Sequence, residues 1–326
     1  MIDGILNVYK EKGYTSHDVV AKLRGILRQK KIGHTGTLDP EAEGVLPVCL
    51  GKATRLCDML TDKTKTYRAG LLLGRETDTQ DIWGQILKEQ QINGLTMDQD
   101  RVREIIMGFV GEYAQIPPMY SALKVNGKKL YDLARAGKVV ERQPRQVFLY
   151  QIEIQSMELP RVSMTVSCSR GTYIRTLCHD IGVKLGCGGC MESLTRTQVD
   201  RFKIEDSLDL ARIEELRDKG TLEEHIMPIE AMFSHYPSVT ATREGDRFLH
   251  NGNPLKAHLA AAGQRESQED QAERGSWEPD RDGACFRVYD SSGQFMGIYQ
   301  WQQEQRRLKP QKIFFTNSWG IGGQKG

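Results

Sequence analysis

The segment Lys31–Pro47, with the sequence KIGHTGTLDPEAEGVLP, holds the side chains best suited to chemistry. His34 and Asp39 lie in it beside two glycines, which indicates a tight polar loop, and an apolar stretch follows. The ring of Pro40 keeps Asp39 out of the helical region, and a carboxylate presented by a loop can act as a nucleophile or a base. An Asp-Pro pair is also a common turn former, and a single histidine is often a structural hydrogen-bonding residue. The segment by itself leaves both interpretations open.

Motifs for nucleotide-dependent chemistry and for serine hydrolysis are missing from the sequence. Gly51-Lys52-Ala53-Thr54 resembles part of a phosphate-binding loop, but the full motif needs a glycine at Leu46 and a serine or threonine at Ala53. No GxGxxG follows a predicted strand, and no serine occupies a GxSxG elbow. We therefore expect chemistry that needs neither a nucleotide nor a nicotinamide cofactor.

The cysteines do not form a recognisable metal site or disulfide framework. Cys187 and Cys190 have CxxC spacing, but no second CxxC or histidine pair follows, and only His179 lies close before them. A structural zinc site needs four ligands, so we expect reduced thiols and no metal. A total of seven cysteines, scattered and odd in number, favours a reducing compartment.

The composition is typical of a globular protein outside the membrane. Hydrophobic residues make up 39% and charged residues 27% of the 326 residues, which excludes a mainly disordered chain. No apolar run approaches the roughly 18 residues of a membrane helix. The N-terminal residues MIDGILNVYKEKG carry charges where a signal peptide is apolar. We expect a cytoplasmic location and no membrane contact.

The elements that must position the loop alternate between helical and strand patterns. Ser16 can cap a helix with an apolar stripe from Val19 to Leu27. Residues 162–168 place alternate apolar side chains on one face of a strand, a turn follows at 170–172, and 173–185 show a helical pattern. The mixture predicts an α/β (α+β) domain in which helices pack on a substantial sheet.

From about Pro237 the pattern changes to short strands with turns, including the segment PSVTATREGDRFLHNGNPL. Ser291–Gly293 fits a hairpin turn between strands at Phe286–Tyr289 and Phe295–Tyr299. The length also favours two domains. We expect a catalytic domain over 1–235, a small β domain over 236–316 with a disordered insertion at 260–283, and a flexible tail over 317–326.

The loop sequence GHTGTLDPEAEGVLP closely resembles the catalytic motif of the TruB family of pseudouridine synthases, which act on tRNA. The resemblance continues in order through four further blocks and spans about residues 2–230. It covers the blocks Lys65–Ala69, Gln115–Lys124, Arg170–Leu177 and Gly188–Thr197. It implies the mixed-sheet fold of pseudouridine synthases, followed by a PUA-like RNA-binding β-barrel.

Two blocks depart from the family pattern. The Lys-Pro pair near the N-terminus of the family reads Lys10-Glu11 here, and the usual Leu-Arg-Arg reads Leu194-Thr195-Arg196. Neither change affects Asp39. The second could alter one RNA contact.

The resemblance implies an isomerisation that detaches uracil from the ribose of a uridine, rotates it and rejoins it through C5, without a cofactor. By the family match Asp39 is the catalytic carboxylate, Arg175 its ion-pair partner, and Tyr67 the ring against the flipped base. The match also implies substrate contacts from His34, Tyr173, Leu194 and Arg196. Whether Asp39 attacks the sugar, adds to the base or removes a sugar proton stays open.

The implied partner is tRNA, bound through its T-stem-loop (uridine 55), with the C-terminal domain at the acceptor stem. The net charge of +2 excludes binding by bulk charge, yet three basic stretches stand out, at 22–31, 124–145 and 306–312. The segment 264–282 carries four net negative charges, so the rest of the chain carries about six positive ones. We expect a monomer that requires no protein partner.

Two other functions remain open from the sequence. One is an RNA chaperone without enzymatic activity, although chaperone activity alone needs none of Asp39, Tyr67 and Arg175. The other is a synthase of the same fold that acts on ribosomal or guide-directed RNA. No additional recruiting module is evident in the chain to support a guide-directed enzyme.

Overall fold

A computed structural model describes residues 1–61, 63–92, 97–121, 123–125, 127–138, 140–262 and 281–315. The chain forms two compact units. The larger comprises Leu6–Val48 and Leu56–His225, and the smaller comprises Met1–Ile5, Cys49–Arg55 and the chain from Ile226 onward. The domain boundary expected at 235/236 stays a prediction.

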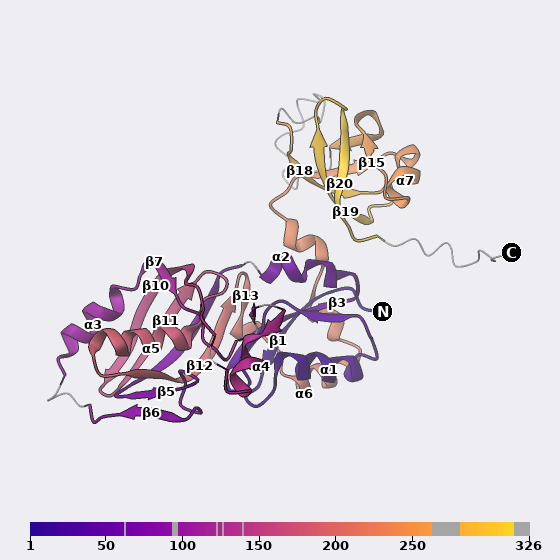
Figure 1. Ribbon diagram of the computed structural model, residues 1–326. Helices are drawn as coiled ribbons and strands as arrows, with labels where there is room; N and C mark the ends of the chain where they lie inside the picture. The colour runs from indigo at the N-terminus through magenta and orange to yellow at the C-terminus, as the bar shows by residue number, and fades with distance from the viewer. Residues whose placement is uncertain are drawn as a thin grey trace. The chain divides into compact units, whose positions relative to one another are not determined.

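A ten-stranded mixed sheet dominates the fold, with helices packed on it, so the predicted fold class is confirmed (Figure 1). Its main path runs β14-β1-β3-β12-β4-β11-β10-β7, while β2 pairs with β3 and β13 with β12. The strands are β1 (Gly4–Lys10), β2 (Ile32–His34), β3 (Glu43–Leu50), β4 (Lys65–Leu73), β7 (Gly111–Gln115), β10 (Arg145–Glu158), β11 (Arg161–Cys168), β12 (Gly189–Val199), β13 (Phe202–Lys203) and β14 (Ile226–Met227). Two hairpins stand apart, β5 (Arg75–Thr77) with β6 (Ile86–Glu89) and β8 (Lys124–Val125) with β9 (Lys128–Lys129).

Helices α3 (Gln99–Met107) and α5 (Ile174–Leu185) cover one face of the sheet and enclose the main core (Figure 1). Strand β11 shows why the sheet packs this way. Its alternate side chains Val162, Met164, Val166 and Cys168 are buried, as the sequence predicts. The remaining helices are α1 (Ser16–Ile26), α2 (Cys57–Thr61), α4 (Leu130–Arg135) and α6 (Leu210–Lys219).

The expected cap of α1 is wrong by one residue. Thr15, not Ser16, is the N-cap: its hydroxyl accepts a hydrogen bond from the Asp18 amide, and the Asp18 carboxylate accepts one from the Thr15 amide. This reciprocal pair is a capping box. The hydroxyl of Ser16 instead accepts a hydrogen bond from the Leu38 amide, which connects α1 to the loop that carries Asp39.

The smaller unit contains the expected barrel as a nearly closed six-stranded sheet, ordered β16-β20-β19-β18-β15-β17. The predicted hairpin is present as β18 and β19. Residues 243–250, however, form helix α7 (Arg243–His250) rather than a strand, because the Thr242 hydroxyl caps them. The strands are β15 (Ser238–Ala241), β16 (Leu255–Lys256), β17 (Ala260–Ala262), β18 (Cys285–Tyr289), β19 (Phe295–Gln302) and β20 (Arg307–Ile313).

The expected insertion and tail fall mostly outside the described residues. At the start of the insertion, Ala260–Ala262 is strand β17 and pairs with β15, so the ordered barrel extends into the segment expected to be disordered. Residues 263–280 and 316–326, which hold most of the insertion and the tail, lie outside the described residues, as does Asn126 between β8 and β9.

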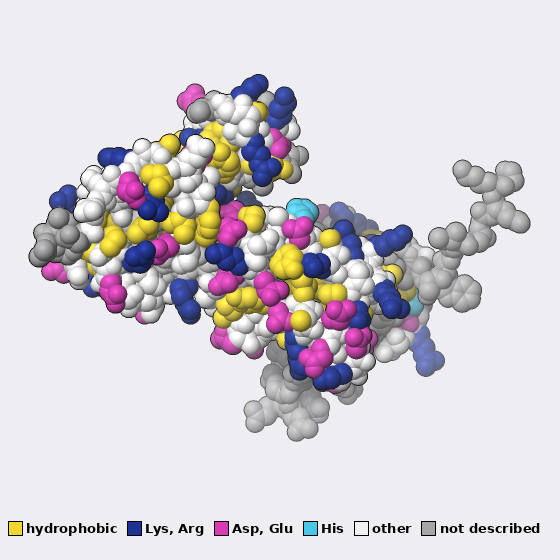
Figure 2. Space-filling view, turned by 90° about the horizontal axis from the view of Figure 1, so that it is seen from below, with side chains coloured by type: hydrophobic (Ala, Val, Ile, Leu, Met, Phe, Trp, Pro, Cys, Tyr) yellow, Lys and Arg dark blue, Asp and Glu magenta, His cyan; other side chains and the backbone are white. Residues whose placement is uncertain are grey.

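The surface and the cysteines agree with a globular, reduced protein. Acidic and basic side chains are intermingled on the face shown in Figure 2. All seven cysteines are free, and burial raises the pKa of Cys190 to about 11. Across the described ranges there is no cluster of three or more potential metal ligands, and no helix is long and apolar enough to cross a bilayer.

Candidate active site

The Asp39 loop connects two paired strands, β2 and β3, and re-enters the sheet at Gly44. The backbone of Gly44 has φ +104°, and a Cβ there would lie 2.2 Å from the carbonyl oxygen of Arg196 on β12. Only glycine accepts both conditions. The close approach fixes the end of the loop against the centre of the sheet.

Lys10, at the end of β1, anchors the Asp39 loop through hydrogen bonds to the loop backbone. Its side chain is fully buried, and its Nζ donates to the carbonyl oxygens of Pro40 (3.1 Å) and Ala42 (2.5 Å). Burial lowers the pKa of Lys10 to about 8, against the opposing effect of Asp39 and Glu41. In the sequence Lys10 stands out only as half of an altered motif, and no local pattern indicates this contact.

Arg175 lies next to Asp39 although 136 residues separate them in the sequence. Its Nη2 is 3.2 Å from Asp39 Oδ2 and donates to the Tyr120 carbonyl at 2.7 Å. The Arg175 side chain is 7% exposed, while that of Asp39 is 38% exposed. A buried guanidinium thus holds an accessible carboxylate in one orientation, which suits a nucleophile or base.

Asp81 is a second carboxylate near the Arg175 guanidinium, and it is not among the residues predicted from the sequence. Its Oδ2 lies 3.8 Å from Arg175 Nη1, and its Oδ1 accepts hydrogen bonds from the Thr79 hydroxyl and the Trp83 amide. Burial raises the pKa of Asp81, and Arg175 and the two hydrogen bonds oppose that rise. Two aspartates within Asp78–Gly84 were the available signal, but nothing local connects them to Arg175.

Gln115, at the end of β7, fixes the start of α5. Its Oε1 accepts from the Tyr173 amide at 2.7 Å and its Nε2 donates to the Tyr173 carbonyl at 3.0 Å. Tyr173 is the N-cap of α5 and has no side-chain cap of its own. Gln115 therefore satisfies the Tyr173 N–H, which the helix leaves open, and adds a second hydrogen bond to the Tyr173 carbonyl, which also accepts from the Leu177 amide.

Tyr67 and Arg196 lie directly opposite each other on the antiparallel strands β4 and β12, and Leu194 is two residues along on the same face. Tyr67 and Leu194 are buried in the main core beside Leu38 of the loop. Arg196 is 1% exposed, and its Nε donates to the Val45 carbonyl at 2.7 Å. Burial raises the pKa of Tyr67, and Arg196 counteracts this.

His34, at the start of the loop, is half-buried. Its Nδ1 accepts from the Gly36 amide at 3.3 Å, and its ring meets that of His17 edge to face at 5.3 Å. Burial, with the His17 charge as the next cause, lowers the pKa of His34. A neutral ring at neutral pH can still donate and accept hydrogen bonds to RNA bases.

The seven predicted residues thus come from four separated segments that meet around Asp39. Electrostatic interactions link Asp39 with Tyr67 and Tyr173, and Arg196 with His34. Their individual roles stay predictions. Lys10, Asp81 and Gln115 are the additions that the structure makes to the set.

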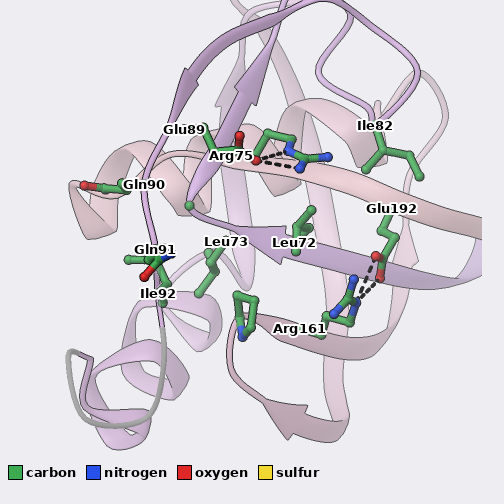
Figure 3. A pocket seen from close by; sticks show the side chains of 12 residues that line it. Leu72, Leu73, Arg75, Ile82, Glu89, Gln90, Gln91, Ile92, Arg161 and Glu192 are labelled. Atoms are coloured by element: carbon green, nitrogen blue, oxygen red, sulfur yellow. Dashed lines mark hydrogen bonds and ion pairs between the residues drawn. The ribbon is translucent and has the colours of Figure 1, made fainter.

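A separate cavity of about 390 Å³ lies where the β5–β6 hairpin meets the ends of β4 and β12. Two ion pairs, Arg75 with Glu89 and Arg161 with Glu192, flank it (Figure 3). None of the seven predicted site residues lines it. This cavity is therefore distinct from the Asp39 site.

Comparison with known proteins supports the same assignment along most of the chain. Residues 24–174 match the N-terminal domain of the TruB family pseudouridylate synthases. Residues 175–234 match the C-terminal domain of tRNA pseudouridylate synthase B.

Similar proteins cover nearly the full length. The chain is 52% identical over 324 residues to the tRNA pseudouridine synthase B of Lachnoclostridium phytofermentans, covering 96% of this chain and 100% of that one. It is 42% identical to the synthase of Clostridium acetobutylicum, covering 91% and 95%. A solved Cbf5-Nop10-Gar1 complex contains a chain with TM-score 0.67 and 27% identity, covering 97% of this chain and 86% of that one. With two family models and these relatives in agreement, the chain belongs to the TruB family of pseudouridylate synthases.

Proposed function

We propose that this enzyme converts the uridine at position 55 in the T-loop of tRNA to pseudouridine, with the Asp39 carboxylate as the catalytic group. One observation supports this most directly. The carboxylate is accessible, yet it is held by a buried guanidinium and a loop anchored at both ends. Relatives named tRNA pseudouridine synthase B support tRNA as the substrate.

The reaction exchanges one glycosidic bond for another. The C1′–N1 bond breaks, the uracil rotates, a C1′–C5 bond forms, and the proton on C5 is lost while N1 gains one. Nothing is oxidised or hydrolysed, so no cofactor is needed. An accessible carboxylate can attack C1′, add to the base or remove a sugar proton, and each of these routes regenerates Asp39 at the end.

The uridine must leave the RNA stack to reach Asp39, at a cost of a few kcal/mol. Tyr67 and Leu194 form an apolar floor beside Asp39, and Tyr173 stands at the start of α5. A ring against the flipped base and hydrogen bonds to its edge offset part of the flipping cost. We assign Tyr67, Tyr173 and Leu194 to the uridine, and His34 to the adjoining RNA.

The rest of the tRNA needs a longer surface. The basic stretches supply phosphate contacts, and we place the acceptor stem against the barrel of the smaller unit. A monomeric enzyme, independence from protein partners and a cytoplasmic location stay predictions.

The test is to incubate the protein alone with an unmodified tRNA transcript and to map pseudouridine at single-nucleotide resolution. We expect product at uridine 55 without added cofactor, guide RNA or protein. Asp39→Asn and Asp39→Ala should keep tRNA affinity and abolish product. Asp58→Asn, an exposed carboxylate on α2, is the matched control and should retain full activity. Full activity in either Asp39 variant contradicts the proposal, and modification that requires a guide RNA favours the alternative substrate class.

A further inference from the structure

Arg196 is a buried cation for which the described part of the chain provides no carboxylate partner. Its Nε donates to the Val45 carbonyl, and its Nη2 is buried with no hydrogen-bond partner within the described part of the chain. No ion pair with an aspartate or glutamate forms among those residues. Burying such a charge costs several kcal/mol of desolvation free energy unless another group compensates it. The burial of Arg196 therefore lowers the stability of the folded protein unless a neighbouring group offsets this cost.

The loop covers Arg196 on the side that faces RNA in the proposed function. A Cβ on Gly36 would lie 3.8 Å from Arg196 Nη1, and Val45 closes the other end of the same loop. A phosphate or base cannot reach a guanidinium that is 1% exposed without moving this loop. The side chain therefore acts on something inside the protein.

The group in position is Tyr67. The two residues are directly opposite on β12 and β4, where facing side chains have Cβ atoms roughly 5 Å apart. We propose that Arg196 is a positioning residue that acts through Tyr67, stabilising its phenolate when Tyr67 removes the C5 proton of the rejoined base.

This inference rests on the proposed function. Once the C1′–C5 bond has formed, C5 carries both the ribose and its original hydrogen. The Tyr67 phenol first gives its proton to N1, and the phenolate formed in this way takes the C5 proton. The C–H electron pair then forms the C5=C6 bond, and the N1=C6 electron pair returns to N1. Tyr67 returns to its phenol form, and the base regains the C5=C6 double bond of uracil.

The resting Tyr67 side chain is a phenol because its pKa is raised, so the phenolate forms only during the reaction step. Burial raises the pKa of Tyr67, and the neighbouring charges of Cys168 and Asp39 add to the rise. Arg196 is the group that lowers it, by its charge and by a side-chain interaction. Besides Tyr67, the titratable groups that interact with Arg196 are Lys10, His34 and Cys168. None is an anion at neutral pH, since burial raises the pKa of the Cys168 thiol to about 11.

The experiment measures single-turnover rate constants at saturating tRNA for the full chain. Arg196→Gln should lower the rate at least about tenfold, with tRNA affinity within about twofold of wild type. The matched control is Arg68→Gln, an exposed arginine on β4 one residue from Tyr67, which should leave both values unchanged.

Two measurements separate this role from a structural one. In a Tyr67→Phe background, Arg196→Gln should cause no further loss of rate. Replacing Tyr67 with 3,5-difluorotyrosine, a more acidic phenol, should restore part of the rate lost in Arg196→Gln, because this phenol gives up its proton more readily during the step.

An equal loss in the Tyr67→Phe background, or no rescue by the fluorinated tyrosine, overturns the inference. If Arg196→Gln does not fold, Arg196→Lys replaces it in the same comparisons, with a smaller loss of rate expected. Failure of the wild-type protein to modify tRNA would instead count against the proposed function.

Discussion

Arg175 shows how much of this site depends on the geometry of one side chain. Its guanidinium contacts a carboxylate on the Asp39 loop, the Tyr120 carbonyl and the more distant Asp81. A planar guanidinium presents its N–H groups in fixed directions, whereas an ammonium group on a flexible stem carries rotatable donors that do not fix an orientation.

Arg175→Ala should therefore lower the rate at saturating tRNA by about 10²- to 10³-fold, with a modest loss of affinity. Arg175→Lys keeps the charge but should recover only a small part of the rate. Single-turnover kinetics and a binding titration check both values. The control is Arg161→Ala, which breaks an exposed ion pair with Glu192 and should stay near wild type. Unchanged turnover in Arg175→Ala would remove Arg175 from the site.

Lys10 gives the site a measurable pH signature. Its pKa is lowered to about 8 in the folded protein, against 10.5 for the ordinary side chain. The unfolded chain therefore binds more protons between these values, and stability rises with pH across that window.

Relative to Lys10→Met, the wild-type protein should gain about 2 kcal/mol of unfolding free energy between pH 7 and pH 9.5. Urea unfolding of both proteins at the two pH values gives the difference. A constant difference would mean that Lys10 titrates normally in the folded state.

The sequence identified single residues well where chemistry and local motif coincide, as at Asp39 and Tyr67. It did not identify Lys10, Asp81 and Gln115 because their contacts join segments between 30 and 94 residues apart in the chain. Arg196 was assigned to substrate, while burial under the loop is a property only the fold determines.

At the scale of elements, the start of helix α5 is fixed by a residue of another element, Gln115 on β7. The helix begins at the residue after Tyr173, and the capping comes from β7 through Gln115 rather than from a local side chain. The sequence predicted this helix to the correct end because its apolar spacing is regular. Helix α7 was not predicted from the sequence. It has only eight residues, and its apolar pair Phe248-Leu249 resembles part of a short strand.

Gln115→Leu keeps the side-chain size and removes both hydrogen bonds to Tyr173. We expect a rate loss of about tenfold or more, because a small displacement of Arg175 disturbs Asp39. We also expect a loss of about 1–3 kcal/mol in unfolding free energy, because the Tyr173 N–H is left unpaired. Kinetics and chemical unfolding report the two effects. Gln155→Leu, an exposed glutamine on β10, is the control and should change neither.

At the scale of the whole molecule, the net charge of +2 hides an uneven distribution along the sequence. Strand β20 of the smaller unit carries Lys309 and Lys312, part of the third basic stretch. If the barrel contacts the acceptor stem, these lysines neutralise phosphates and release counterions.

Replacing Lys309 and Lys312 with alanine should weaken tRNA binding and reduce the slope of log affinity against log salt by about two. The pair Lys88→Ala and Lys219→Ala, both exposed in the larger unit, is the control and should leave the slope unchanged. Binding titrations at several salt concentrations measure it. An unchanged slope in the β20 variant would place the acceptor stem elsewhere.

Strand β12 is hydrogen-bonded to β4 along one edge and to β3 along the other, and it carries Leu194 and Arg196. Backbone amides in such an interior strand exchange with solvent only when the whole sheet opens. The floor of the site therefore does not loosen on its own, and activity and native structure should disappear together on heating. When the protein binds RNA, we therefore expect the RNA to change its conformation and to fit a protein surface that the sheet keeps rigid.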